Sequence, residues 1–159
     1  MGKLAPVMPI AMASIALLSL AAVAPEVFAA KPPEFKVKVE IRRAEAEPAD
    51  DLTEAVVSGT NQKVYLHKKA DVTNEDIADA KMILIEDKYP AIEITFTKAG
   101  KKKMAVYSKE QMGKPMAILV DGVVITAPTV KSKIGDKAWI QGMFTATEAQ
   151  DIANGIKSK

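Results

Sequence analysis

The stretch Met116-Ala-Ile-Leu-Val-Asp-Gly-Val-Val-Ile-Thr-Ala-Pro128 contains two apolar runs joined by the dipeptide Asp121-Gly122. Both central residues of a type I′ turn need positive φ, and the Asp-Gly pair is a strong signal for such a turn, so this pattern predicts a tight β-hairpin. Residues 116–120 are apolar without interruption, which predicts a central strand covered on both faces. We therefore interpret Asp121 as a turn residue and not as an acid catalyst.

Alternation of apolar and polar residues predicts further strands on the N-terminal side. Phe35–Ile41 alternates cleanly between apolar and charged residues, and Lys63–Lys68 shows a shorter version of the same pattern. Such alternation is typical of a strand with one buried and one solvated face. Residues 81–85 and 92–97 flank a proline-containing turn and predict a second hairpin. The acidic, alanine-rich residues 44–51 predict an exposed connection.

The first long helix is predicted to begin at Thr97 or Lys98 and to end near Met112. Gly113 follows it, and glycine in the left-handed conformation ends many helices. A shorter helical turn is predicted at Thr73–Asp76, where a threonine hydroxyl can accept a hydrogen bond from a free backbone N–H.

The C-terminal part combines a strand with a final helix. Ala138–Phe144 is predicted as a strand, and Thr145–Glu148 matches a capping box that opens a helix. The residues of this helix that are predicted to face the core are Ala149, Ile152, Ala153 and Ile156. The whole pattern predicts an α+β fold, with one antiparallel sheet and two amphipathic helices on one of its faces.

Residues 1–29 have the pattern of an export segment. A near-continuous apolar stretch follows Lys3, and Val27-Phe28-Ala29 fits the small-residue rule for a signal-peptide cleavage site. The alternative is an uncleaved membrane anchor formed by residues 4–24, which is long enough to span a bilayer. Either interpretation predicts a periplasmic or extracellular domain at residues 30–159. The chain has no cysteine, so neither a lipoprotein anchor nor a disulfide is available.

The charge balance argues against nucleic acid as a partner. The chain of 159 residues has a formal net charge of +2, and removal of residues 1–29 takes away one basic and one acidic residue, so that the balance is unchanged. A nucleic-acid-binding domain usually concentrates basic residues on one face. We interpret the short run Lys101–Lys103 as a solvated helix face.

No pattern in the sequence predicts catalysis, a cofactor or a metal. His67 is the sole histidine, and it is interpreted as a partly exposed strand residue beside two lysines. Glu75, Asp76 and Asp79 are interpreted as acids that stabilise a helix start rather than as metal ligands. Gly113-Lys114 lacks the flanking residues of a phosphate-binding loop. Trp139 is interpreted as a core residue. Which residues bind a partner is left open.

Several stretches resemble motifs of the SecD family, an accessory subunit of the bacterial preprotein translocase. The Gly-initiated helix and the segment after it resemble the pattern that leads into LAIVLDGxVxSAP, and a later segment resembles IxGxFTxxEA. An upstream segment resembles lTgxdIxdA. The matching stretches, in chain order, are Val72–Ala80, Gly100–Ala105, Gly113-Lys114, Met116–Pro128 and Ile140–Ala149. Together they cover roughly residues 71–155, in the same order and at nearly the same spacing as in the family.

The resemblance implies the ferredoxin-like head of the first large extracytoplasmic domain, which in the family is thought to contact translocating preprotein. Two positions depart from the pattern: Thr126 replaces a serine, and Ile134–Ala138 replaces a glycine-rich turn. The membrane helices and proton-conducting residues of SecD have no counterpart in residues 30–159, so energy coupling is not implied for this chain.

Two functional hypotheses remain open at this point. One is a non-catalytic module that binds polypeptide in the cell envelope by adding a client strand to an exposed sheet edge, either Phe35–Ile41 or Lys63–Lys68. The other is a structural or regulatory subunit of an envelope assembly, with no client binding. Membrane contact is expected only through an uncleaved N-terminus.

Overall fold

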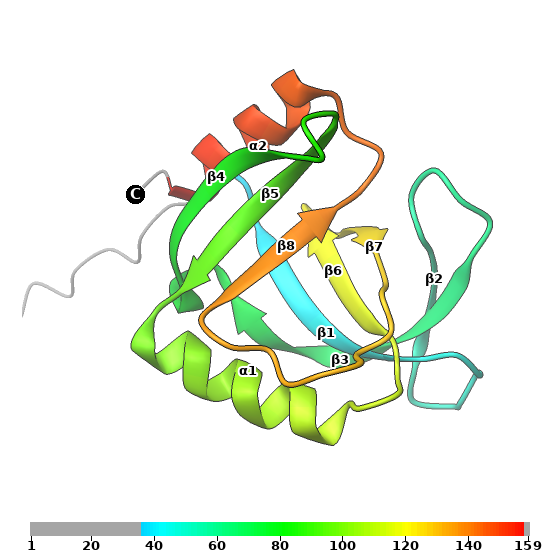
Figure 1. Ribbon diagram of the computed structural model, residues 1–159. Coiled ribbons are helices and arrows are strands. Elements are labelled where there is room, and N and C mark those ends of the chain that lie inside the picture. Colours follow the sequence, from blue (N-terminus) through cyan, green and yellow to red (C-terminus); the bar gives the residue numbers. More distant parts are fainter. Residues whose placement is uncertain (1–35, 158–159) are drawn as a thin grey trace, which may run out of the picture. The chain divides into compact units, whose positions relative to one another are not determined.

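The computed structural model describes residues 36–157, whose strands form two antiparallel sheets (Figure 1). The larger sheet has the strand order β2-β3-β1-β6-β7, and the smaller has the order β4-β5-β8. The strands are β1 (Val39–Glu45), β2 (Thr53–Val56), β3 (Lys63–Thr73), β4 (Ile77–Ile85), β5 (Tyr89–Phe96), β6 (Met116–Val120), β7 (Val123–Thr126) and β8 (Lys137–Gln141). The helices are the 3-10 turn η1 (Asn74–Asp76), α1 (Lys98–Glu110) and α2 (Ala146–Lys157).

Strand β6 lies inside the larger sheet, between β1 and the edge strand β7, and it is buried along its whole length, as the apolar run predicts. Met116, Ile118 and Val120 face the main hydrophobic core, which both sheets and both helices share. Ala117 and Leu119 point the other way, into a smaller core beneath β2 and β3. One strand therefore separates two hydrophobic cores.

The Asp121-Gly122 turn joins β6 to β7 as predicted. Asp121 has φ 49° and Gly122 has φ 83°, so both central residues are in the left-handed region that a type I′ turn requires. Asp121 also binds Lys38 just before β1: its Oδ1 accepts from Lys38 N at 2.7 Å, and its own N–H donates to Lys38 O at 2.8 Å. The turn thus fixes where β1 begins against β6.

The α+β class, with antiparallel strands and two helices, is confirmed, but the strands form two sheets instead of the single sheet expected. The 3-10 turn η1 separates β3 from β4 and directs β4 and β5 into a hairpin that pairs with β8. Alternation identifies a strand and its buried face, but it does not specify which strand pairs with which.

Several strand boundaries also differ from the predictions. Pairing in β1 runs over Val39–Glu45 rather than Phe35–Ile41, of which Phe35 lies outside the described residues. Strand β2 was not predicted, because residues 53–56 are mostly exposed and carry no strong apolar alternation. The export segment predicted at residues 1–29 also lies outside the described part of the chain.

Both helices begin close to their predicted positions because the expected caps form. Thr97 Oγ1 accepts from Gly100 N at 3.0 Å at the start of α1. The Thr145–Glu148 box opens α2, with Glu148 Oε2 accepting from Thr145 N at 2.8 Å and Thr145 Oγ1 accepting from Glu148 N at 3.2 Å. Helix α2 packs against β4 and β5, whereas α1 contacts β3, η1 and β5 (Figure 1).

Substitution of Gly100 by alanine tests the close packing of α1 against η1. Alanine normally favours a helix by about 1 kcal/mol over glycine, but the backbone carbonyl of Asp76 occupies the space that the new Cβ would take. We therefore expect Gly100→Ala to lower the free energy of unfolding by about 1–3 kcal/mol, measured in urea.

Gly135→Ala is the matched control for this prediction. A Cβ at Gly135 meets no atom within 4 Å, so this variant is expected to be as stable as the unsubstituted protein or slightly more stable. A Gly100→Ala protein that matches Gly135→Ala in stability would contradict the packing argument.

Candidate binding grooves

An apolar groove lies where β7, the segment after β2 and the segment between β8 and α2 meet. It consists of two adjoining hollows of about 340 Å³ and 260 Å³, both lined by Ser58, Ile125 and Met143. It is also lined by Ala127, Pro128, Gly142, Phe144 and Ile152, and the carboxylates Glu148 and Asp151 line the larger of the two hollows. We call this surface the apolar groove.

Met143 is the most exposed large apolar side chain of the described residues, with 78% of its surface accessible. It lies over Gly59, where a Cβ would collide with its sulfur. Gly142, next to it, leaves room for Ile125 and Phe144, since a Cβ there would lie 2.6 Å from Ile125 Cγ2. The two glycines therefore permit the side chains of the groove to pack closely around an exposed methionine.

The two motifs that carry the resemblance to SecD meet at this groove. Ile125–Pro128 belongs to the first motif, and Gly142–Phe144 belongs to the second. These segments are separated in the sequence, and β7 and β8 belong to different sheets. The sequence contained both segments, but their meeting depends on the fold of the two sheets and was not predicted.

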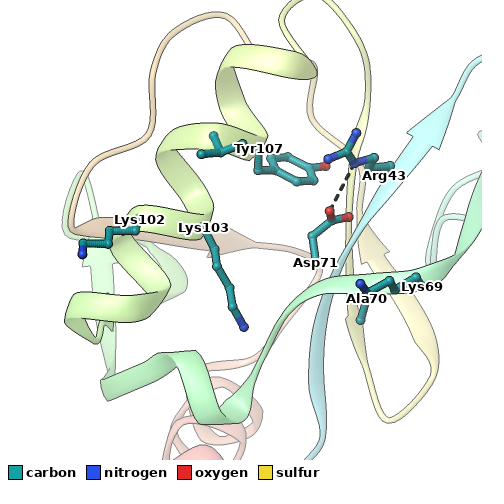
Figure 2. A pocket seen from close by; sticks show the side chains of 8 residues that line it. Arg43, Lys69, Ala70, Asp71, Lys102, Lys103 and Tyr107 are labelled. Atoms are coloured by element: carbon teal, nitrogen blue, oxygen red, sulfur yellow. Dashed lines mark hydrogen bonds and ion pairs between the residues drawn. The ribbon is translucent and has the colours of Figure 1, made fainter.

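A separate hollow of about 460 Å³, which shares no lining residue with the apolar groove, lies between α1 and β3 (Figure 2). Four of its lining residues are cations, namely Arg43, Lys69, Lys102 and Lys103, and Asp71 is the one carboxylate among them. Ala70, Val106 and Tyr107 complete the lining. We call this surface the basic groove. The lysines of α1 were predicted to be solvated, and Lys101, Lys102 and Lys103 are exposed.

Ion pairs hold two of the four cations in place. Figure 2 shows Arg43 directed at Asp71, with Nε 3.1 Å from Oδ1, and its Nη2 donates to Glu110 Oε2 at 2.7 Å. The pKa of Arg43 is raised, chiefly by the hydrogen bond to Glu110. Lys103 Nζ lies 2.8 Å from Oδ2 of the buried Asp76. These pairs join β1 and β3 to α1 and η1.

Tyr107 is the buried neutral residue behind the basic groove. It is 1% exposed, and its hydroxyl donates to the backbone carbonyl of Arg42 at 3.1 Å. Burial raises the pKa of the Tyr107 hydroxyl well above its usual value, so the group stays protonated and continues to donate. Its hydrogen bond satisfies a carbonyl at the position where the pairing of β1 with β3 is irregular.

Lys69 and Lys102 form no ion pair with any residue between positions 36 and 157. Lys69 lies on β3 and Lys102 on α1, so each of these two elements contributes one lysine without an ion pair to the lining of the hollow. The positive charge that remains available to a ligand is therefore concentrated in these two lysines.

The sheet edges differ from those expected. Phe35–Ile41 was expected to be an edge strand, but β1 pairs with β3 on one side and with β6 on the other. Residues 63–66 of β3 are paired with β2, so most of the predicted edge Lys63–Lys68 is also covered. Beyond Leu66, however, no strand of the described chain pairs with β3 on the side opposite β1. That open edge borders the basic groove.

The three acids considered as metal ligands have different surroundings in the structure. Asp76 pairs with Lys103, and Asp79 pairs with Lys157 at 3.2 Å, while Glu75 is exposed. No group of three His, Cys, Asp or Glu side chains within residues 36–157 is arranged to hold a metal ion. His67 is a partly exposed residue of β3, with Nε2 3.5 Å from Glu45 Oε1.

Trp139 is not a core residue, contrary to the prediction. It is 53% exposed, because its neighbours Ala138 and Ile140 face the core and alternation along β8 directs Trp139 outward. Its indole Nε1 donates to Glu93 Oε2 at 3.2 Å on the neighbouring strand β5. The alternation around Trp139 was the signal in the sequence that could have placed it correctly.

The family model described as "SecDF, P1 head subdomain" matches residues 34–158, which include both grooves. The chain belongs to the SecDF P1 head subdomain family. Its relatives include the protein translocase subunit SecD of Aquifex aeolicus, 31% identical over 124 residues that make up 76% of this chain and 25% of that protein. The protein translocase subunit SecDF of Thermus thermophilus is 36% identical over 88 residues, which are 55% of this chain and 12% of that protein.

The fold of this chain is similar to that of a solved SecDF structure. A solved structure titled "Structure and function of a membrane component SecDF that enhances protein export" has a TM-score of 0.63 and 24% sequence identity to this chain, and the match covers 78% of this chain and 63% of that one. At that identity the likeness establishes the fold of the head subdomain. The chain spans a quarter or less of the length of the two curated relatives above. No helix among residues 36–157 is long and apolar enough to cross a membrane.

The contacts of Glu93 on the outer face of the smaller sheet predict a measurable pKa. Lys137 lies 3.0 Å and Lys81 3.3 Å from Glu93 Oε1, and Trp139 donates to Oε2. These contacts lower the pKa of Glu93 to about 2, with the hydrogen bond from Lys137 as the largest cause. A carboxyl NMR titration of the folded protein is expected to show a midpoint near that value.

The lowered pKa of Glu93 makes the stability of the fold depend on pH. The pKa is lower in the folded state than in the unfolded chain, so the contacts stabilise the fold above the unfolded value of about 4.3 and lose that contribution as the pH falls through the folded value. Lys137→Met is expected to raise the pKa of Glu93 more than Trp139→Phe. The opposite order, or an unshifted midpoint in the unsubstituted protein, would contradict the assignment.

Proposed function

We propose that this chain is a non-catalytic, extracytoplasmic domain of the protein export machinery that binds unfolded polypeptide in the apolar groove. The observation that carries the proposal is the meeting of the two family motifs around the exposed Met143. Membership of the SecDF P1 head subdomain family supports a role in export, since the relatives are named as protein translocase subunits. On this proposal, residues 30–159 form the binding domain, and residues 1–29 direct or anchor it outside the cytoplasm.

The chemistry of the groove suits an unfolded client. An unfolded polypeptide exposes apolar side chains that a folded protein would bury, and their transfer out of water favours binding. Methionine is unbranched and polarisable, so one methionine can pack against side chains of different shapes. Ile125, Phe144 and Ile152 supply the rest of the apolar surface. Such a surface favours apolar segments in general and does not select one sequence.

A charged residue in place of Met143 tests the proposal. Met143→Asp introduces a carboxylate that an apolar client segment would have to desolvate. We expect this variant to bind a permanently unfolded probe, reduced and carboxymethylated α-lactalbumin, at least about tenfold more weakly, a loss of about 1.4 kcal/mol or more. The measurement is fluorescence anisotropy or calorimetry with the purified domain.

Met112→Asp is the matched control, because Met112 is also an exposed methionine, at 48%, and lies outside the apolar groove. It is expected to bind the probe like the unsubstituted protein. Equal binding by all three proteins would rule out the apolar groove as the client site. Absence of any binding by the unsubstituted domain would overturn the polypeptide-binding function itself.

A second candidate function is that of a subunit in an envelope assembly, with no client binding. It is favoured by the exposed aromatic side chains of the smaller sheet, where Trp139 is 53% and Tyr89 54% accessible. A photocrosslinking residue at Tyr89 and another at Met143, tested separately in the cell envelope, distinguish the two functions. Many exported chains captured from Met143 support client binding, whereas a single stoichiometric partner captured from Tyr89 alone supports the assembly.

A further inference from the structure

We propose that the basic groove is a second polypeptide site, distinct from the apolar groove, which binds an acidic segment in extended conformation along the open edge of β3. Its carboxylates pair with Lys69 on one wall and with Lys102 on the other. This inference goes beyond the binding of apolar segments proposed above, because it concerns another surface and another class of segment.

The positive charge that remains available in the basic groove favours an anionic ligand. Arg43 and Lys103 are already paired with Asp71, Glu110 and Asp76, so these groups hold the walls and have little charge to offer a ligand. Lys69 and Lys102 remain uncompensated, and each is attached to a different element. Complementary charge at such a site steers and selects an anionic partner. A segment with several carboxylates satisfies both lysines at once.

The unpaired edge of β3 favours a ligand in extended conformation. The pairing of β2 with β3 ends at Leu66, and the groove is lined by Lys69, Ala70 and Asp71 of the following segment. An unpaired edge can accept an additional strand, whose backbone hydrogen bonds give affinity while pockets for alternate side chains give specificity. Neighbouring strands lie about 4.8 Å apart, so an added strand would lie close to β3, within reach of the lysine side chains.

The apolar contact beside the lysines favours a polypeptide over a small anion. Val106 on α1 is 56% exposed and lines the same hollow, and Tyr107 lies behind it. Lys102 and Val106 lie one turn apart on α1 and line the same hollow, so the side chains on one face of an extended segment meet both the lysine and Val106. An anionic membrane surface would contact the exposed lysines of α1 and would need neither the hollow nor the edge of β3.

The test uses a soluble fluorescent peptide of alternating glutamate and threonine and its counterpart with glutamine in place of glutamate. We expect the glutamate peptide to bind at least about tenfold more tightly than the glutamine peptide, and more weakly as the salt concentration is raised, since exposed charges are screened. The charge-reversal variant Lys69→Glu/Lys102→Glu is expected to lose at least about tenfold in affinity for the glutamate peptide.

Two control variants keep this test independent of the proposed function. Lys131→Glu/Lys133→Glu makes the same change in net charge at exposed lysines outside the groove and is expected to bind the glutamate peptide within about threefold of the unsubstituted protein. Met143→Asp is expected to bind the glutamate peptide normally, because Met143 lines the apolar groove only. Loss of glutamate-peptide binding in either control would overturn the assignment to the basic groove.

Strand addition has a separate readout. In an extended peptide every second residue directs its N–H and C=O to the same side. N-methylation of either the glutamates or the threonines should therefore abolish binding, while N-methylation of the other set should preserve it within about threefold. An equal effect of the two methylated peptides would contradict pairing with β3. Binding of phosphatidylglycerol vesicles through Lys69 and Lys102, without peptide binding, would overturn the proposal in favour of a lipid surface.

Discussion

The burial of β6 on both faces is the constraint on which the rest of the structure depends. Alternate residues of this strand face two different cores, the larger around Ile118 and the smaller around Leu119. A slip of one residue would exchange the two sets and place the small Ala117 where Ile118 fills the main core. The register is held by the left-handed Asp121-Gly122 turn at one end of the strand and by the bond from Met116 N to Pro128 O at the other. Because β7 follows directly, this register also sets the position of Ile125–Pro128 along the apolar groove.

The two grooves arise at different borders of this arrangement. The apolar groove lies where β7 of the larger sheet approaches the segment that follows β8 of the smaller one. The basic groove lies where α1 covers β3, and its walls are tied by Arg43 to Asp71 and Glu110. The two sets of lining residues do not overlap. Substitutions in one groove therefore leave the lining residues of the other unchanged.

Features that depend on neighbouring residues could be predicted from the sequence, whereas features that depend on distant contacts could not. The Asp121-Gly122 turn, the caps at Thr97 and Thr145 and the apolar run of β6 are local, and the structure confirms them. The division into two sheets depends on β5 choosing β4 and β8 as partners, which alternation leaves undetermined. Trp139 was predicted in the core because tryptophan is highly buried on average. Its position between the inward-facing Ala138 and Ile140 instead directs it outward.

The two candidate grooves could not be predicted from the sequence, because each brings together residues that lie far apart in the chain. The apolar groove joins residues near position 126 to residues near position 143, and the basic groove joins Lys69 to Lys102. A net charge of +2 gave no sign of the basic groove, because the charge of the whole chain averages over pairs that cancel locally and lysines that do not. If both proposals hold, an exported chain meets two grooves of unlike chemistry on one domain. A chain that engages both grooves at once is expected to be retained longer than a chain held by either groove alone, because the second contact forms at a high effective concentration.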